Sequence, residues 1–261
     1  MYRSLSLEYD RLYQEQLEAF QQRLVNTYPQ HTGYTDFYPA IGVPAHAPVV
    51  DLLVYGQAVG GWQPNHDYAQ PVPKSRTAQS REQSNGHYGT DSPLDWVNAM
   101  WSKSEHAQLE PARLDYYMKL GDYNPSRSFF WQVTTYFIQQ KFNVEPSCWK
   151  WTEHLVWSNL YKIATQTDNP SEADRILQRP ECVGLVRQEL MELQPKYCLV
   201  LTNDAWWSHF RTGLPTELMA EINDEYIERV ERFGPTTIVV VKRPRVGSYK
   251  KTVDRILSHL P

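Results

Sequence analysis

The sequence has little cysteine and no long apolar run. Its three cysteines, Cys148, Cys182 and Cys198, are widely spaced and form no CxxC or Cys/His pattern, so neither a zinc site nor a disulfide framework is predicted. No run approaches the ~20 apolar residues that span a bilayer, and the polar N-terminus MYRSLSLEYD differs from a signal peptide. We therefore expect a soluble, cytoplasmic protein with no metal and no cofactor.

Net positive charge and the common catalytic motifs are also missing. The formal charge of −4 argues against a surface that coats DNA as a whole, although it is compatible with a local basic segment. No P-loop and no Ser-His-Asp arrangement stands out, and GQAVGG at residues 56–61 is not a GxGxxG motif. The 261 residues, 41% of them hydrophobic, suit one α/β domain spanning residues 1–261.

The stretch 51–62, DLLVYGQAVGGW, is the most informative part of the chain. Residues 49–55 form a nearly continuous apolar run, which is typical of a strand buried on both faces of a parallel sheet. The run stops at Gly56, where glycine allows a sharp turn and a close approach of ligand to backbone. Ligands of open α/β sheets bind beyond the carboxyl ends of the strands, so segment 56–62 is the first candidate site. An ordinary strand-to-helix turn is the alternative.

Three further apolar segments, 152–158, 197–202 and 236–241, also predict buried strands. The expected helices cover residues 4–27, 92–104, 124–142, 171–193 (interrupted near Pro180), an acidic segment within 215–233, and the C-terminal segment ending at 260. Residues 33–48 and 63–91 are predicted to be loops, the second of them an insertion or lid. This order predicts a three-layer α/β/α sandwich with a four-stranded, mainly parallel central sheet.

Polar residues or glycine follow each predicted strand. They are Gly56 and Gln57, then Asn159, then the run Thr202-Asn203-Asp204, and finally the run KRPR at 242–245. Amide side chains carry both donors and acceptors, as recognition of a nucleobase edge requires. These residues therefore predict a pocket for a planar polar ligand.

In this layout the chain resembles the uracil-DNA glycosylase superfamily from about residue 51 to residue 255. Its segment 56–60, GQAVG, stands in the place of a first motif that reads GQDPY, GINPG or GEAPG in different branches. Segment 123–133, YNPSRSFFWQV, is similar to the NRFW-type segment of the mismatch-specific branch. Asn159 stands where the superfamily has its base-reading Asn, and 242–248, KRPRVGS, stands where it has HPS or NPS. The turn GQAVGGW is also similar to the GQETNGW-type turn of uncharacterised bacterial proteins of this fold.

The resemblance implies a DNA-repair hydrolase that binds, and excises, a damaged or modified base. It implies catalytic roles for Gln57 and Asn159. The base pocket would be lined by Gly56, Ala58, Gly60, Trp62, Tyr123, Phe130 and Asn159. The chain departs from the family at Ala58, where two branches carry Asp or Asn, at Gln57, where one carries Glu, and at Arg243, where the last motif has His.

Contact with DNA is expected from segment 242–255, in which six basic residues accompany the single acid Asp254. Positive charge concentrated beside a strand end is typical of a loop that binds a nucleic-acid backbone. The expected DNA-binding residues are Lys242, Arg243, Arg245, Gly247, Ser248 and Lys250. Two other functions remain open. One is binding of a nucleobase, nucleotide or nucleic acid without chemistry, favoured by the missing first-motif acid. The other is a protein-interaction domain, favoured by the acidic helix expected at 217–231.

Overall fold

The computed structural model describes residues 1–28, 33–58, 65–85, 93–94, 97, 127–145, 149–243 and 249–260. The helix expected at 92–104 lies almost wholly outside these ranges. So do six of the expected site residues, namely Gly60, Trp62, Tyr123, Arg245, Gly247 and Ser248.

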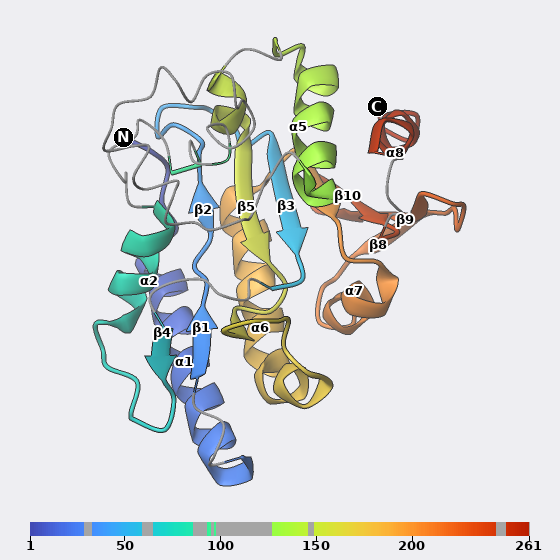
Figure 1. Ribbon diagram of the computed structural model, residues 1–261. Helices are drawn as coiled ribbons and strands as arrows, with labels where there is room; N and C mark the ends of the chain where they lie inside the picture. The colour runs from blue at the N-terminus through green and yellow to red at the C-terminus, as the bar shows by residue number, and fades with distance from the viewer. Residues whose placement is uncertain are drawn as a thin grey trace.

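A seven-stranded mixed sheet forms the centre of the molecule (Figure 1). Across the sheet its strands are β2 (Ala40–Ile41), β5 (Leu155–Asn159), β3 (Leu52–Gly56), β7 (Tyr197–Val200), β10 (Thr236–Val241), β9 (Ile227–Phe233) and β8 (Glu217–Glu221). The four predicted strands, β5, β3, β7 and β10, are parallel neighbours in the middle. The predicted number of four strands is wrong, because β2, β9 and β8 extend the sheet in antiparallel pairing.

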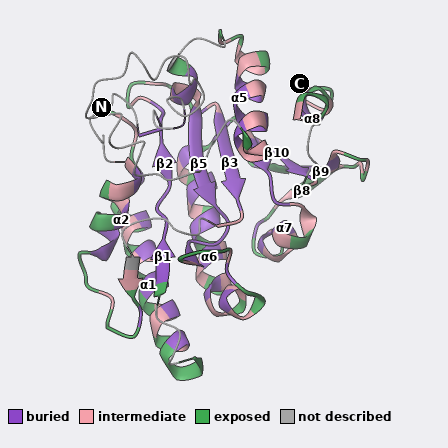
Figure 2. Cartoon of the chain, in the orientation of Figure 1, coloured by how far each residue is buried: buried purple, intermediate pink, exposed green. Residues whose placement is uncertain are grey.

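Helices cover both faces of the parallel strands. One face packs against α1 (Leu7–Thr27), α6 (Glu172–Leu193) and α7 (Asp204–Arg211), the other against α5 (Phe129–Phe142) and α8 (Tyr249–Leu257). Successive residues of a strand point to opposite faces, so Leu53 and Tyr55 join the first core while Leu52 and Val54 join the second. A 3-10 helix, Trp149–His154, leads into β5. Strands β3 and β5 are consequently buried along their whole length (Figure 2).

A second, three-stranded antiparallel sheet joins β4 (Asn65–Asp67), β1 (Gly33–Asp36) and β6 (Ile163–Thr165). The prediction that residues 33–48 and 63–91 are loops is therefore wrong, because β1, β4 and the helix α2 (Arg76–Asn85) lie within these ranges. The Asp36 carboxylate accepts a 2.7 Å hydrogen bond from Nε of Arg76, and the two side chains are 0% and 4% exposed. Because α2 buries polar rather than apolar side chains, its sequence lacks the helical apolar periodicity.

The acidic helix expected within 215–233 is also wrong, because this segment is the β8–β9 hairpin. Its turn is closed by Asp224, whose Oδ1 accepts hydrogen bonds from the backbone N–H groups of Tyr226 and Ile227, both at 2.8 Å. Of the two acids of β9, Glu231 pairs with Arg211 and Arg229, and Glu228 accepts from the backbone N–H of Asp204. Charged strands of this kind lack the apolar alternation that marks a half-buried strand.

The long helix α6 is continuous, whereas an interruption near Pro180 was expected. Ser171 caps it: its Oγ accepts from the backbone N–H of Asp174, whose carboxylate accepts in return from the N–H of Ser171. The proline removes one donor, but buried residues on both sides of it pack against α1 and hold the helix together.

Candidate functional site

Gly56 and Asn159 lie side by side at the carboxyl edge of the sheet, as the last paired residues of β3 and β5. A Cβ atom on Gly56 would lie 2.5 Å from Oδ1 of Asn159 and 3.5 Å from Cε2 of Phe130. Any side chain larger than glycine would therefore collide with Asn159. The structure thus brings together three of the residues that the sequence predicted for one pocket.

The side-chain amide of Asn159 is buried, with 1% of the residue exposed. Among the described residues its Nδ2 has no hydrogen-bond partner. A buried donor without an acceptor costs about 1–3 kcal/mol, so native structures rarely keep one without a reason. The half-buried ring of Phe130 stands beside it, packed edge-on against Trp131 at 4.9 Å between ring centroids. An amide donor next to an aromatic ring is suited to a flat ligand that carries a carbonyl group.

Behind Asn159, a buried ion pair fixes the end of β5. Nζ of Lys162 donates to Oγ of Ser158 and to the backbone carbonyl of Asn159, each at 2.7 Å, and pairs with Glu189 at 2.6 Å. The Tyr9 hydroxyl donates to the same carboxylate at 2.5 Å, and burial together with the charge of Glu189 raises the pKa of Tyr9 well above its ordinary value. Sequence reasoning missed these residues, because an isolated Lys and a Glu in a helical segment look like solvated side chains.

Gln57 is directed away from Asn159. The alternation of β3 points it toward the face that α6 covers, where its Oε1 accepts a 3.1 Å hydrogen bond from Nδ2 of Asn169. Ala58 packs partly buried against the core on that same face. The described contacts therefore do not bring Gln57 into the group formed by Gly56, Asn159 and Phe130.

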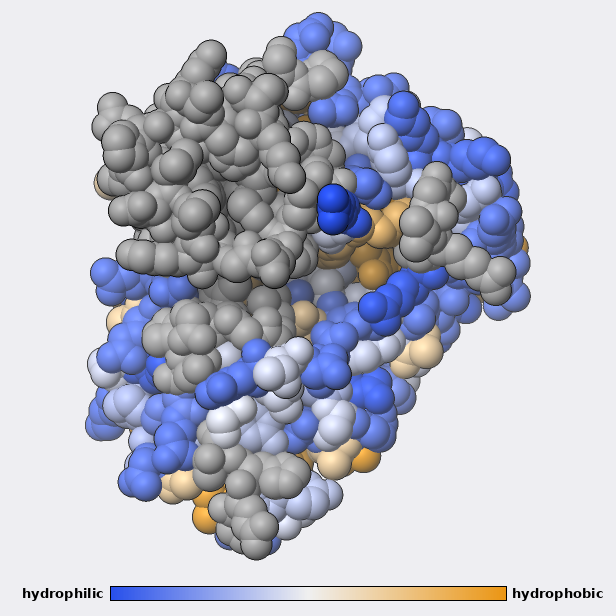
Figure 3. Space-filling model, in the orientation of Figure 1, coloured by the Kyte–Doolittle hydropathy of each residue, from blue (hydrophilic) through white to orange (hydrophobic). Residues whose placement is uncertain are grey.

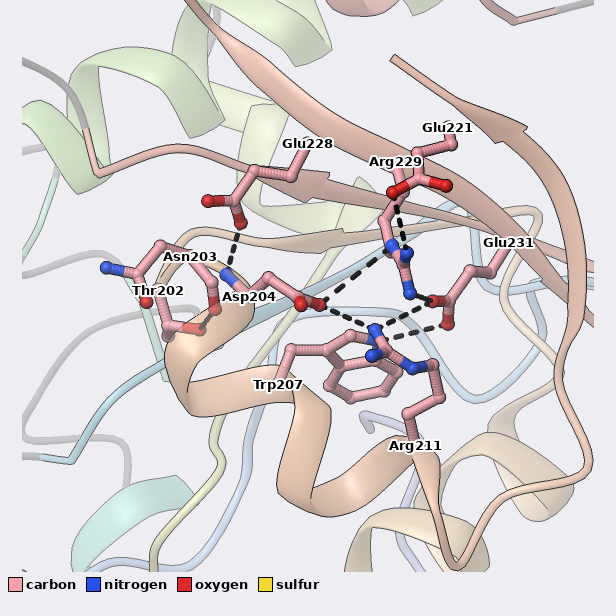
Figure 4. Close-up of polar contacts among 9 residues, drawn as sticks. All are labelled: Thr202, Asn203, Asp204, Trp207, Arg211, Glu221, Glu228, Arg229 and Glu231. Atoms are coloured by element: carbon pink, nitrogen blue, oxygen red, sulfur yellow. Dashed lines mark hydrogen bonds and ion pairs between the residues drawn. The ribbon is translucent and has the colours of Figure 1, made fainter. Parts of the chain in front are cut away.

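Asn203 follows β7 at the same edge, and its backbone N–H donates to the carbonyl of Val241 at 3.1 Å. Its backbone has φ 77° and ψ 167°, a conformation that costs about 1–3 kcal/mol for a residue other than glycine. It does not cap α7. Instead, the Glu228 carboxylate accepts from the N–H of Asp204 (Figure 4). Burial raises the pKa of Glu228, although this hydrogen bond opposes the shift.

The remaining charges of Figure 4 form a structural network between α7 and β9. Arg211 pairs with Asp204 at 2.5 Å and with Glu231 at 3.3 Å, and Arg229 pairs with Glu231 at 3.4 Å. Nε1 of Trp207 donates to Glu231 at 3.0 Å. Because these groups satisfy one another, the network explains the charges of Arg229 and Glu231 without a ligand.

The described basic residues near the end of β10 are largely accessible. Arg243 and Lys250 are exposed, whereas Lys242 is intermediate and its backbone N–H donates to Tyr226 at 2.9 Å. Arg255 differs, because its Nε pairs with Asp224 at 2.5 Å and so helps to hold the hairpin.

Within the described ranges there is no cluster of three or more His, Cys, Asp or Glu side chains suited to a metal ion. His154 pairs with Asp51 at 2.7 Å and stacks on Phe142. Since Asp51 precedes β3, this pair lies at the opposite edge of the sheet from Asn159. None of the described helices has the length and apolarity needed to span a membrane.

No protein-family model matches the chain, and no curated protein matches its sequence. The assignment of function consequently depends on the geometry at the carboxyl edge.

Proposed function

We propose that this chain is a divergent uracil-DNA glycosylase-like protein that binds a damaged or modified base of DNA at the carboxyl edge of its sheet. The observation that carries the proposal is the convergence of Gly56, Asn159 and Phe130, with Nδ2 of Asn159 buried and unpartnered among the described residues. The parallel order of β5, β3, β7 and β10 and the helices on both faces are compatible with that fold.

The chemistry of these three residues suits a base that has left the DNA stack. Nδ2 of Asn159 offers a hydrogen bond to a carbonyl oxygen of the base, and stacking on Phe130 would contribute about 1–3 kcal/mol. Figure 3 shows a hollow with a hydrophobic floor between α5, which carries Phe130, and the β8–β9 hairpin. Flipping a base costs a few kcal/mol, which the exposed Arg243 and Lys250 would help to offset through phosphate contacts.

Binding without excision is the second candidate, and the first motif favours it. Excision needs a water held against the sugar carbon and stabilisation of the charge that develops there. Ala58 supplies no polar group, and the amide of Gln57 is engaged with Asn169. The third alternative, an interaction domain, loses its support because the acidic segment forms a hairpin rather than a helix.

A panel of DNA duplexes containing uracil, hypoxanthine, xanthine or alkylated bases tests the proposal. We expect tighter binding to at least one of them than to unmodified DNA, and Asn159→Ala should weaken that preference at least tenfold. The exposed Asn26 on α1 provides the matched control Asn26→Ala, which should change nothing. Formation of abasic sites that requires Asn159 identifies a glycosylase, and preference without product identifies a binding protein. Equal affinity for all duplexes would refute both.

A further inference from the structure

A cluster of donors lies on the face of the sheet that α6 and α7 cover, opposite the face that carries Phe130. We define it by Tyr161, Arg175, Arg179, Trp206 and His209 and call it the arginine cluster. Tyr161 follows Asn159 by two residues, and its backbone N–H donates to the carbonyl of Gln57 at 3.0 Å. The cluster therefore begins at the same edge of the sheet, at most about 7 Å of extended backbone from Asn159.

Two donors of the arginine cluster, the buried Nε atoms of Arg175 and Arg179, have no acceptor among the described residues. Tyr161 is 0% exposed, and burial raises the pKa of its hydroxyl while the hydrogen bond and the charge of Arg179 oppose that shift. Both unsatisfied donors belong to groups that are always charged. Unsatisfied donors of this kind are suited to an anionic oxygen rather than to a carbonyl or a base.

The two guanidinium groups are already positioned for such a contact. Arg175 and Arg179 are four residues apart on α6 and so share one face of the helix. The guanidinium of Arg175 lies 4.4 Å from the centroid of the Trp206 ring, which itself packs 5.6 Å from the ring of Tyr161. A stacked, planar guanidinium loses little entropy when it binds, because its orientation is fixed beforehand.

The local charge is positive. Glu172 pairs with Nη2 of both arginines, at 3.2 Å for Arg179, but its side chain is 57% exposed. Two cations beside one carboxylate leave an excess of one positive charge. The excess also affects His209 on α7. Burial lowers the pKa of His209 below its ordinary value, and the charges of Arg179 and Arg175 lower it further, while the charge of Glu172 opposes the shift.

We propose that the arginine cluster is a phosphate-binding site, contacted by a nucleic-acid strand that crosses the carboxyl edge. The site lies outside segment 242–255, where the sequence predicted phosphate contacts. It goes beyond the proposed function, because phosphate binding here requires neither base recognition nor excision.

Binding of inorganic phosphate, and separately of an unmodified single-stranded oligonucleotide, tests the proposal over a series of salt concentrations. Arg179→Gln should weaken both about tenfold and lower the salt slope for the oligonucleotide by about one. Glu172→Gln should strengthen both, because it removes the competing carboxylate. Arg187, exposed two turns further along α6, provides the control Arg187→Gln with the same loss of charge and less than a twofold effect.

The outcomes separate this proposal from the base pocket. Oligonucleotide and phosphate binding that both depend on Arg179 support a backbone contact, and phosphate binding alone supports a free phosphate or mononucleotide as the ligand. Either result supports the phosphate-binding site even if the duplex panel shows no preference for a modified base. Equal effects of Arg179→Gln and Arg187→Gln, weaker binding in Glu172→Gln, or no binding to either probe overturn the proposal, whatever the duplex panel gives.

Discussion

At the scale of single residues, the site depends on one position where only glycine fits. Gly56→Ala would place a methyl group against Oδ1 of Asn159, which is itself buried and short. We expect a loss of about 1–3 kcal/mol in the free energy of unfolding, as for other overpacked cores, and loss of ligand preference. Urea denaturation measures the first effect, and the duplex panel measures the second.

The control for that substitution is Gly184 on α6, where a Cβ would meet nothing within 4 Å. Gly184→Ala should raise the free energy of unfolding by about 0.5–1 kcal/mol, because alanine loses less entropy in a helix. A Gly56→Ala protein as stable as the wild type would show that Asn159 is free to move aside.

The Lys162–Glu189 pair is a second feature of single residues, since both side chains are completely buried. Lys162→Met leaves the Glu189 carboxylate without its partner and should cost about 3–5 kcal/mol. Adding Glu189→Leu should restore much of this loss, because an apolar pair of similar volume is often as stable as a buried ion pair. Urea denaturation of the single and double variants measures the coupling. A double variant no more stable than the single one would mean that the cost comes from packing rather than charge.

At the scale of elements, the short helix α2 depends on one buried ion pair. Asp36→Ala would leave Arg76 buried without its carboxylate, and it would also remove one of the two acceptors of the Ser80 hydroxyl. We expect a loss of about 3–5 kcal/mol. Faster amide hydrogen exchange should accompany it in residues 79–85. The exposed pair of Glu8 and Arg11 on α1 is the control, and Glu8→Ala should leave both measurements unchanged.

Which elements could be predicted follows from how each one is buried. The four central strands are apolar on both faces, so a run such as Leu52, Leu53 and Val54 identifies them directly. Helix α2 and strand β9 bury charged side chains with partners distant in sequence, among them Arg76 and Glu231. Local periodicity carries no information about such partners.

The same reasoning applies to the candidate site. Asn159 and Phe130 were predicted from the resemblance of their segments to a known motif. The register of β3 and β5 brings Asn159 beside Gly56, and the packing of α5 brings Phe130 to the same place. The direction of Gln57 depends on where the strand ends, which the sequence predicted only to within a residue or two. The arginine cluster was missed, because Glu172 followed by Arg175 and Arg179 has the spacing of ordinary ion pairs on a solvated helix.

At the scale of the whole molecule, the core on the α1 side buries several phenol and thiol groups. Burial raises the pKa of Cys182 to about 12, and it raises the pKa of Cys198 well above its ordinary value of 9.0. It also raises, well above 10.0, the pKa of four phenols that line the same core, namely Tyr9, Tyr13, Tyr55 and Tyr68. This core therefore makes the whole fold sensitive to alkali.

The direction of that sensitivity follows from proton linkage. A raised pKa means that the folded protein keeps a proton that the unfolded chain has already lost. The stabilisation from these groups is thus complete below the unfolded values of 9.0 and 10.0 and is lost as the pH rises through the folded ones. Above its unfolded value, each group lowers the free energy of unfolding by about 1.4 kcal/mol per pH unit.

We expect cooperative alkaline unfolding, in which the phenolate absorbance of the buried tyrosines and the loss of circular dichroism coincide. Tyr68→Phe removes one of these groups, so the unfolding transition should release one proton fewer. Ionisation of all tyrosines near pH 10.0 in a protein that stays folded would contradict the prediction.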